Sequence, residues 1–146
     1  MKVITCAAVI LENDKAEILL AQRPEGKAMA GLWEFPGGKL ETAESPEEAL
    51  SRELTEELAI TVNTTDMAPY RFVSHTYGDG INHKPFHLVM LAFKATTFTG
   101  TPEAQEGQTL KWVAKSALTS YLDKTPEADI PLMQELITEA RQVAAA

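Results

Sequence analysis

Residues 41–57 constrain the fold of this chain more than any other stretch, because they carry a complete helix start signal followed by a regular apolar stripe. Ser45 is a typical N-cap residue, Pro46 takes the first helical position, and Glu48 lies three residues after the serine, which completes a capping box. We therefore predict a helix from Ser45 to about Leu58. Its core-facing residues, at helical spacing, are Leu50, Leu54 and Leu58.

The remaining periodicity predicts strands on both sides of this helix. Apolar or alternating runs bounded by turn residues occupy residues 3–11, 18–23, 32–35, 70–77, 86–94 and 109–113. The fourth and fifth of these runs are joined by a polar loop and should form a hairpin. After Pro131, apolar residues recur at helical spacing, so a second amphipathic helix should end the chain. We expect a single α/β domain over residues 1–146, an α/β/α sandwich with a mixed sheet whose strand order the pattern does not specify.

Composition excludes several classes of function. A net charge of −8 and a pI near 4.9 repel a phosphodiester backbone, so we expect no nucleic acid polymer as partner. No apolar run reaches the 18 or more residues of a membrane span, and the first residues lack the pattern of a signal peptide. The single cysteine, Cys6, argues against a disulfide-stapled secreted module. We expect a cytoplasmic protein that is a monomer or a homodimer.

The predicted helix concentrates negative charge. Seven of the 21 acidic residues lie in residues 41–57, and three of them, Glu53, Glu56 and Glu57, fall within roughly a third of the helix circumference. A solvated acidic face is the ordinary explanation for such a run. Crowded carboxylates repel one another, however, and a hard divalent cation such as Mg²⁺ removes that repulsion while it binds substrate phosphates. Gly37 and Gly38 nearby allow backbone to approach a metal or phosphate closely.

The spacing of these residues resembles a known motif. From Gly38 the sequence reads Gly, five residues, Glu44, seven residues, and then Arg-Glu-Leu-Thr-Glu-Glu-Leu-Ala-Ile over residues 52–60. This resembles the Nudix box, G-x5-E-x7-R-E-U-x-E-E-x-G-U, where U is apolar. Ala59 is the one departure, because the family has Gly at this helix end, where a left-handed conformation is usual. An alanine held in that conformation would cost about 1 kcal/mol without touching a ligand.

The resemblance extends to the MutT-type branch through residues 21–24, 31–39, 106–108 and 128–131 and Trp112. It implies hydrolysis of a nucleoside triphosphate to the monophosphate and pyrophosphate, with Mg²⁺ or Mn²⁺. The implied metal ligands are the Gly37 carbonyl, Glu53, Glu56, Glu57 and the distal Glu106. Glu53 would orient or deprotonate the attacking water, and Arg52 would pair with Glu56 at the next turn. Glu44 is either a water-mediated contributor to the metal site or a loop acid near the positive end of the helix.

The same resemblance implies the substrate contacts. Arg23 and Phe35 match positions that contact nucleotide, the ring flanking the base, and Glu34 lies in the same matching run. Asp129 stands where 8-oxo-dGTP diphosphatases commonly have Asn. A carboxylate only accepts hydrogen bonds, so Asp129 suits the N7–H of 8-oxoguanine or the amino group of cytosine, unless it merely caps the final helix. We expect 8-oxo-dGTP as substrate; the alternatives are a CTP- or dCTP-type pyrophosphohydrolase and a nucleotide-sensing module without turnover.

Overall fold

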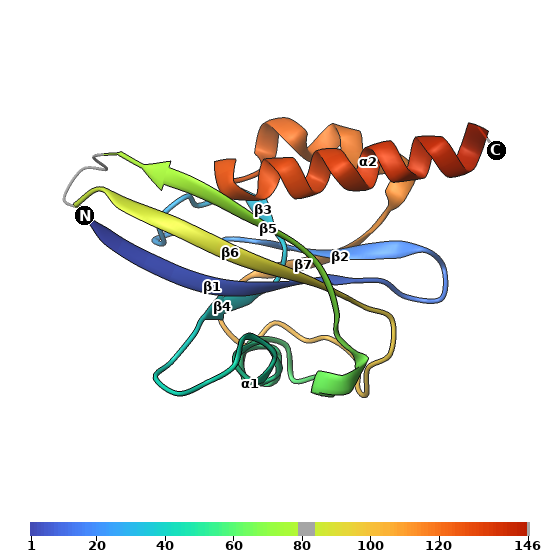
Figure 1. Ribbon diagram of the computed structural model, residues 1–146. Helices are drawn as coiled ribbons and strands as arrows, with labels where there is room; N and C mark the ends of the chain where they lie inside the picture. Colours follow the sequence, from blue (N-terminus) through green and yellow to red (C-terminus); the bar gives the residue numbers. More distant parts are fainter. Residues whose placement is uncertain (79–83, 146) are drawn as a thin grey trace.

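The computed structural model describes residues 1–78 and 84–145. Its strands are β1 (Lys2–Leu11), β2 (Glu17–Gln22), β3 (Trp33–Glu34), β4 (Gly37–Lys39), β5 (Ala68–Tyr77), β6 (Phe86–Ala95) and β7 (Thr109–Ala114). The α-helices are α1 (Pro46–Leu58) and α2 (Ile130–Ala145), and the 3₁₀ segments are η1 (Thr64–Asp66), η2 (Lys115–Lys124) and η3 (Glu127–Asp129). Figure 1 shows the strands as a middle layer with α1 on one side and α2 on the other.

The strands form two sheets. The first has the order β4-β1-β6-β5, in which β1 runs parallel to β6 and the other pairs are antiparallel. The second is antiparallel and has the order β3-β2-β7. The predicted hairpin is present as β5 and β6, with Ser74 opposite Val89. The expected mixed sheet is thus confirmed, and its order places the strand that precedes the acidic helix, β4, directly beside β1.

Alternate side chains of β1 supply two separate cores. Ala7, Val9 and Leu11 are buried in the core that contains the three leucines of α1. Ala8 and Ile10 face the opposite core, which contains the apolar side of α2. Because both faces of β1 are covered, its sequence is continuously apolar rather than alternating, as the sequence predicted. The α/β/α layers are therefore confirmed.

Several local expectations differ from the structure. Gly37–Lys39, expected as a break, forms strand β4, because these residues pair with Cys6, Ala7 and Ala8 of β1. The segment after β7 forms the ten-residue 3₁₀ element η2, which we did not predict. The final helix begins at Ile130, so Pro131 lies in its first turn, where a missing N–H does no harm. Most of the predicted loop between β5 and β6, residues 79–83, lies outside the described residues. No described helix is long and apolar enough to cross a bilayer.

Candidate active site

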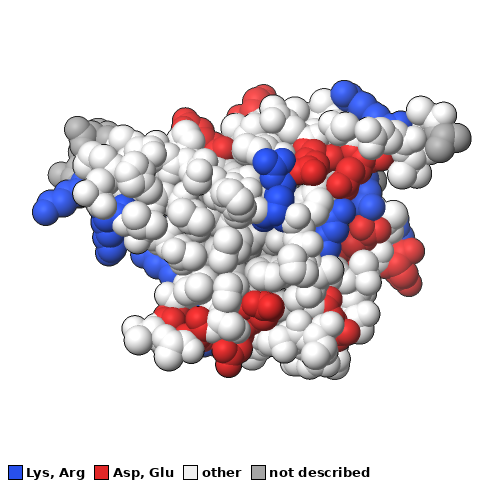
Figure 2. Space-filling model, in the orientation of Figure 1, with Lys and Arg blue, Asp and Glu red and all other residues white. Residues whose placement is uncertain are grey.

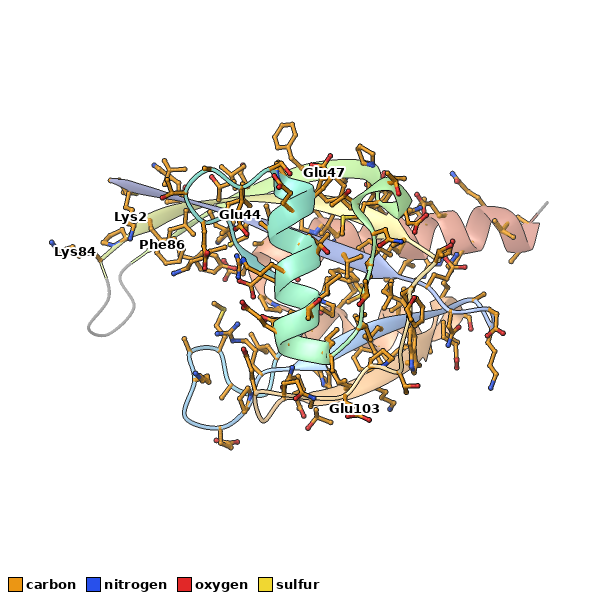
Figure 3. The ribbon with its side chains drawn as sticks, turned by 90° about the horizontal axis from the view of Figure 1, so that it is seen from below. Lys2, Glu44, Glu47, Lys84, Phe86 and Glu103 are labelled. Carbon is orange, nitrogen blue, oxygen red and sulfur yellow. The ribbon has the colours of Figure 1, made fainter. Side chains whose placement is uncertain are left out.

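The acidic helix is held at its start and along its buried side. The Glu48 N–H donates to Ser45 Oγ at 3.1 Å, and the Ser45 N–H donates to Glu48 Oε1 at 3.0 Å, so the predicted capping box is present. The three stripe leucines of α1 are fully buried. These anchors fix the rotation of the helix about its axis, and Figure 3 shows α1 lying across the sheet with Glu44 and Glu47 at its first turn. Acidic side chains gather over this layer in Figure 2.

Two glycines allow β4 to approach its neighbours closely. A Cβ atom on Gly37 would lie 2.0 Å from the Ala7 carbonyl oxygen, which belongs to the backbone of β1. A Cβ atom on Gly38 would lie 2.3 Å from Glu53 Cδ, so the missing side chain of Gly38 is the space that the Glu53 carboxyl group occupies. Glu53, with 16% of its side chain exposed, is therefore held against backbone. This contact places the predicted catalytic glutamate beside the double-glycine segment.

Glu57 lies at the centre of a cluster of negative charge. Burial, followed by the charges of Glu53 and Glu106, raises the pKa of Glu57 to about 8. The sequence separates Glu106 from Glu57 by most of the second half of the fold, yet the structure brings the two into electrostatic contact. A group of hard oxygen donors whose mutual repulsion raises a pKa is the kind of set that a divalent cation stabilises. Glu53, Glu57 and Glu106 therefore fit a metal of this class, together with the Gly37 carbonyl predicted to join them.

The loop that carries Glu106 is tied to the end of α1. The Gln105 N–H and the Gln108 Nε2 both donate to the Glu57 carbonyl oxygen at 3.0 Å, and the Glu103 N–H donates to the Leu58 carbonyl oxygen at 2.9 Å. Gln108 Oε1 in turn accepts the Glu106 N–H at 2.8 Å. These bonds satisfy carbonyl groups that the helix end leaves free. Sequence reasoning noted Gln108 only within the resemblance and missed this role, since nothing in its spacing links residue 108 to α1.

Arg52 joins the acids of the motif into one network. Its guanidinium donates to Glu44 at 2.7 and 2.9 Å, to Glu53 at 3.0 Å, to Glu56 at 3.2 Å and to the Lys39 carbonyl at 3.1 Å. The predicted pair of Arg52 with Glu56 is present, but Glu44 takes the shortest bonds. Hydrogen bonding from Arg52 lowers the pKa of Glu44. Glu44 therefore orients Arg52, a role that neither of its two predicted explanations included.

The three motif glutamates do not converge equally. Glu56 has 55% of its side chain exposed and meets Arg52, whereas Glu53 and Glu57 lie against the protein. Across residues 1–78 and 84–145, no three acidic, histidine or cysteine side chains are already gathered as a complete ligand set. Metal ligation by Glu56 stays a prediction, and it would require the Glu56 carboxylate to turn from its position beside Arg52.

The predicted substrate residues form a second group, in which a cation and an acid pair. Arg23 Nη1 donates to both carboxylate oxygens of Glu34 at 3.0 Å, and its Nε donates to the Ala28 carbonyl at 2.6 Å. Burial raises the pKa of Glu34, and Arg23 opposes that rise. Phe35, the next residue, is only 3% exposed and packs in the core beside α2. Its ring has little open surface in this arrangement, so the predicted contact with a base stays a prediction.

Asp129 lies against the same segment although it is 94 residues away in sequence. Its Oδ2 accepts the Phe35 N–H at 3.1 Å, and the residue is 6% exposed. Burial, followed by the charge of Glu34, raises the pKa of Asp129 to about 7. Its recorded hydrogen bond is thus to the β3–β4 segment and not to the start of α2. The described part of the chain contains no buried side-chain oxygen or nitrogen without a partner, so the second oxygen of Asp129 is not sealed in the core.

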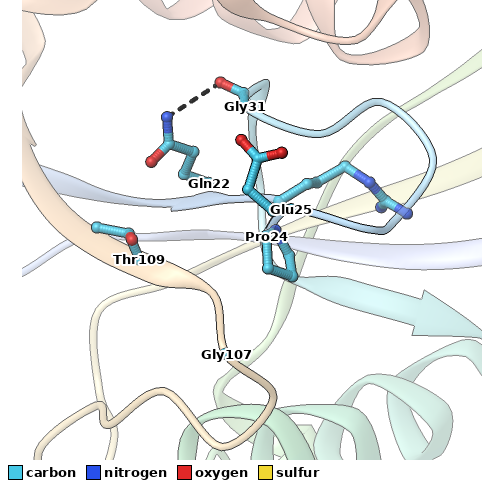
Figure 4. Close-up of a pocket in the computed structure, with 7 residues that line it drawn as sticks. Gln22, Pro24, Glu25, Gly31, Gly107 and Thr109 are labelled. Atoms are coloured by element: carbon cyan, nitrogen blue, oxygen red, sulfur yellow. Dashed lines mark hydrogen bonds between the residues drawn. The ribbon is translucent and has the colours of Figure 1, made fainter.

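A cavity of about 440 Å³ connects the two groups of residues (Figure 4). One wall comes from the segment after β2, where Gln22 Nε2 donates to the Gly31 carbonyl at 3.2 Å. The other comes from the loop before β7, through Gly107 and Thr109. Arg23 lines this cavity, and Gly107 is the neighbour of Glu106. A predicted substrate residue and the loop of a predicted metal ligand thus share one opening.

Comparison with known proteins agrees with this geometry. The model of the NUDIX domain matches residues 2–136. The chain belongs to the Nudix family. It is 40% identical over 134 residues to a CTP pyrophosphohydrolase of Escherichia coli, covering 92% of this chain and 91% of the relative. It is 36% identical over 138 residues to an 8-oxo-dGTP diphosphatase of Haemophilus influenzae, with 94% of each chain covered.

Solved structures give the same result. A structure from work on MutT of Aliivibrio salmonicida and Vibrio cholerae superposes with a TM-score of 0.75 at 35% identity, covering 94% of this chain and 99% of the other. The solution structure of the E. coli ORF135 protein superposes with a TM-score of 0.67 at 39% identity, covering 99% and 94%. This protein is therefore a MutT-type Nudix hydrolase, an enzyme that acts on phosphoric anhydrides. Members of the family generally use divalent metal ions, which agrees with the carboxylates gathered around Glu57.

Proposed function

We propose that this Nudix hydrolase converts a nucleoside triphosphate to the monophosphate and pyrophosphate with Mg²⁺, and that its substrate is 8-oxo-dGTP. The observation that carries the proposal is the position of Asp129 relative to the acidic helix. Burial, the charge of Glu53 from one group and the charges of Asp129 and Glu34 from the other all raise the pKa of Cys6 to about 11, against the opposing charge of Lys39. Both groups therefore lie within electrostatic reach of a single residue on β1, a separation suited to one bound nucleotide.

The residues at the acidic end would bind the metal and direct the water. Glu53, Glu57 and Glu106, with the Gly37 carbonyl, would hold the cation, and Arg52 keeps the Glu53 carboxylate in a defined orientation through its 3.0 Å bond. The bound cation supplies charge neutralisation at the phosphoryl oxygens and lowers the pKa of a coordinated water. Because Glu53 is packed against Gly38, it is the carboxylate that we assign to orient and deprotonate the attacking water.

The residues at the other end would select the base. Oxidation of guanine to 8-oxoguanine replaces the acceptor at N7 by an N–H donor. An ionised Asp129 would accept that N–H, whereas the lone pair on N7 of ordinary guanine would be repelled by the carboxylate. Relatives named 8-oxo-dGTP diphosphatase, at 36% and 31% identity over more than nine tenths of this chain, support the same substrate. Removal of 8-oxo-dGTP would prevent its incorporation into DNA.

CTP is a second candidate substrate, and a specific observation favours it. The relative at 40% identity is named as a CTP pyrophosphohydrolase. Cytosine presents an amino donor at N4, which an ionised Asp129 would also accept. The two candidates make opposite predictions for ordinary dGTP and for CTP, so one substrate panel separates them.

The test is pyrophosphate release over 8-oxo-dGTP, dGTP, CTP and dCTP, each with Mg²⁺ and with Mn²⁺. The proposal expects kcat/KM for 8-oxo-dGTP to exceed the value for dGTP by at least about tenfold, as expected for one well-placed polar contact. Equal values for the two guanine nucleotides would reject 8-oxo-dGTP, and a preference for CTP would select the second candidate. Nucleotide binding without turnover would identify a sensing module instead.

Glu53→Gln tests the catalytic assignment. Because the change removes charge with little change of volume, kcat should fall about 10³-fold while the fold is retained. Glu47→Gln is the matched control, since Glu47 lies on the first turn of the same helix, away from the Gly38 contact (Figure 3). Near-normal kcat in Glu53→Gln would refute the role assigned to Glu53.

A further inference from the structure

The end of β5 holds the short element that carries Asp129. Tyr77 Oη accepts the Ala128 N–H at 3.1 Å, and Ala128 is the residue directly before Asp129. Two positions earlier on the same strand, His75 Nε2 contacts the Glu127 carboxylate. Consecutive residues of η3 are therefore attached to alternate residues of one strand. Neither His75 nor Tyr77 belongs to the acidic site or to the substrate residues that the sequence predicted.

Tyr77 is a firm attachment point because its ring is packed on both sides. The ring stacks on Phe86 with centroids 5.4 Å apart and an interplanar angle of 28°, and the His75 ring meets its edge at 4.6 Å. Burial raises the pKa of Tyr77, so the phenol stays neutral at physiological pH and keeps its hydrogen-bond geometry. Tyr77 is thus a rigid acceptor for the Ala128 amide.

The element η3 depends on such attachments for its position. It spans only Glu127–Asp129, and its internal bond runs from the Asp129 N–H to the Pro126 carbonyl oxygen at 2.9 Å. A single 3₁₀ turn has little stability of its own. Asp129 is therefore located by two contacts from outside the turn, the Phe35 N–H on its carboxylate and the Tyr77 oxygen on the preceding amide.

We propose that Tyr77 is a positioning residue for base selection, which holds η3 so that the Asp129 carboxylate meets the base at a fixed distance. His75 supports it through Glu127. The inference rests on the base-reading role of Asp129 proposed above and adds the residue that makes this role selective. Tyr77 acts through Asp129, so its loss should reduce discrimination between bases and raise KM while kcat, which depends on the acidic helix, changes little.

The test replaces Tyr77 by Phe, which removes the acceptor and leaves the ring that packs on Phe86. We expect the preference for the favoured nucleotide over dGTP to fall about three- to tenfold, which is the weight of one hydrogen bond. The Ala128 amide should also exchange with solvent faster. Tyr70→Phe is the matched control, because Tyr70 lies on the same strand and its hydroxyl donates to Glu139 of α2 at 3.0 Å, away from η3. This control should leave the preference unchanged.

A double-mutant cycle with Asp129→Ala tests whether the effect passes through Asp129. In that background Tyr77→Phe should change the preference by less than about twofold, because coupled residues are not additive. An unchanged preference in the single Tyr77→Phe variant, or an equal loss in both backgrounds, would overturn the inference. If Asp129→Ala alone leaves the preference intact, the base-reading role itself fails, which is a different outcome from the failure of Tyr77.

Discussion

Replacing Ala59 by Gly should stabilise this enzyme. Ala59 is the C-cap of α1 and adopts φ 57° and ψ 33°, the left-handed conformation, while its N–H donates to the Thr55 carbonyl oxygen at 3.1 Å. This conformation costs a residue with a Cβ atom roughly 1–2 kcal/mol, and glycine avoids that cost. The family motif has Gly here, so the backbone at this position is retained although the residue differs.

The net gain is smaller than the relieved strain. Glycine makes the unfolded chain more flexible, which returns about 0.4–1 kcal/mol. Ala59 is exposed, so its methyl group contributes little buried surface. We therefore expect the free energy of unfolding to rise by about 0.5–1 kcal/mol, and the thermal midpoint by roughly 1–4 °C for a chain of this size.

The assay is thermal and urea unfolding of the purified protein, with Ala140→Gly as the control. Ala140 lies within α2, where the same change removes helix propensity and should lower stability by about 1 kcal/mol. Turnover by Ala59→Gly should stay within about twofold of the parent, because Ala59 has no contact with the acidic cluster in the hydrogen bonds described above. A lower midpoint for Ala59→Gly than for the parent would refute the reasoning from backbone strain.

Three further outcomes follow from the site. Gly38→Ala should leave the circular dichroism spectrum unchanged but lower kcat about 10²-fold, because its methyl group would displace the Glu53 carboxyl, 2.3 Å away; normal turnover would contradict this contact. The preference for 8-oxo-dGTP over dGTP should rise from pH 6 to pH 8, because Asp129, with a pKa of about 7, loses the proton that it could donate to N7 of guanine; Asp129→Asn should have a flat profile. Saturating Mg²⁺ should raise the thermal midpoint by roughly 5–10 °C, and Glu57→Gln should diminish that shift.

The candidate site divides into what local spacing can predict and what it cannot. The pair of Arg52 and Glu56 was predictable because residues four apart on a helix are neighbours. The stronger bonds of Arg52 to Glu44 depend on the path of the loop before α1, which no periodicity specifies. The same holds for Gln108, whose side chain reaches the Glu57 carbonyl across 51 residues of sequence.

The resemblance to the Nudix box named residues but not their states. It predicted that Phe35 and Asp129 take part in substrate binding, whereas the structure places the Phe35 ring in the core and uses its amide to hold Asp129. Burial of a carboxylate depends on what the rest of the chain packs around it. The raised pKa values of Asp129 and Glu57 therefore could not be read from the motif.

The sequence by itself determined α1, its capping box, the leucine side of that helix and the strands that cover both faces of β1, because each depends on side chains within a few residues of one another or on a regular period. Only the tertiary structure decided that Gly37–Lys39 would pair with β1, that the loop of Glu106 would join the end of α1, and that Asp129 would be held between Phe35 and the end of β5. Those contacts join segments far apart in the chain, and their geometry depends on how the two sheets and two helices pack together.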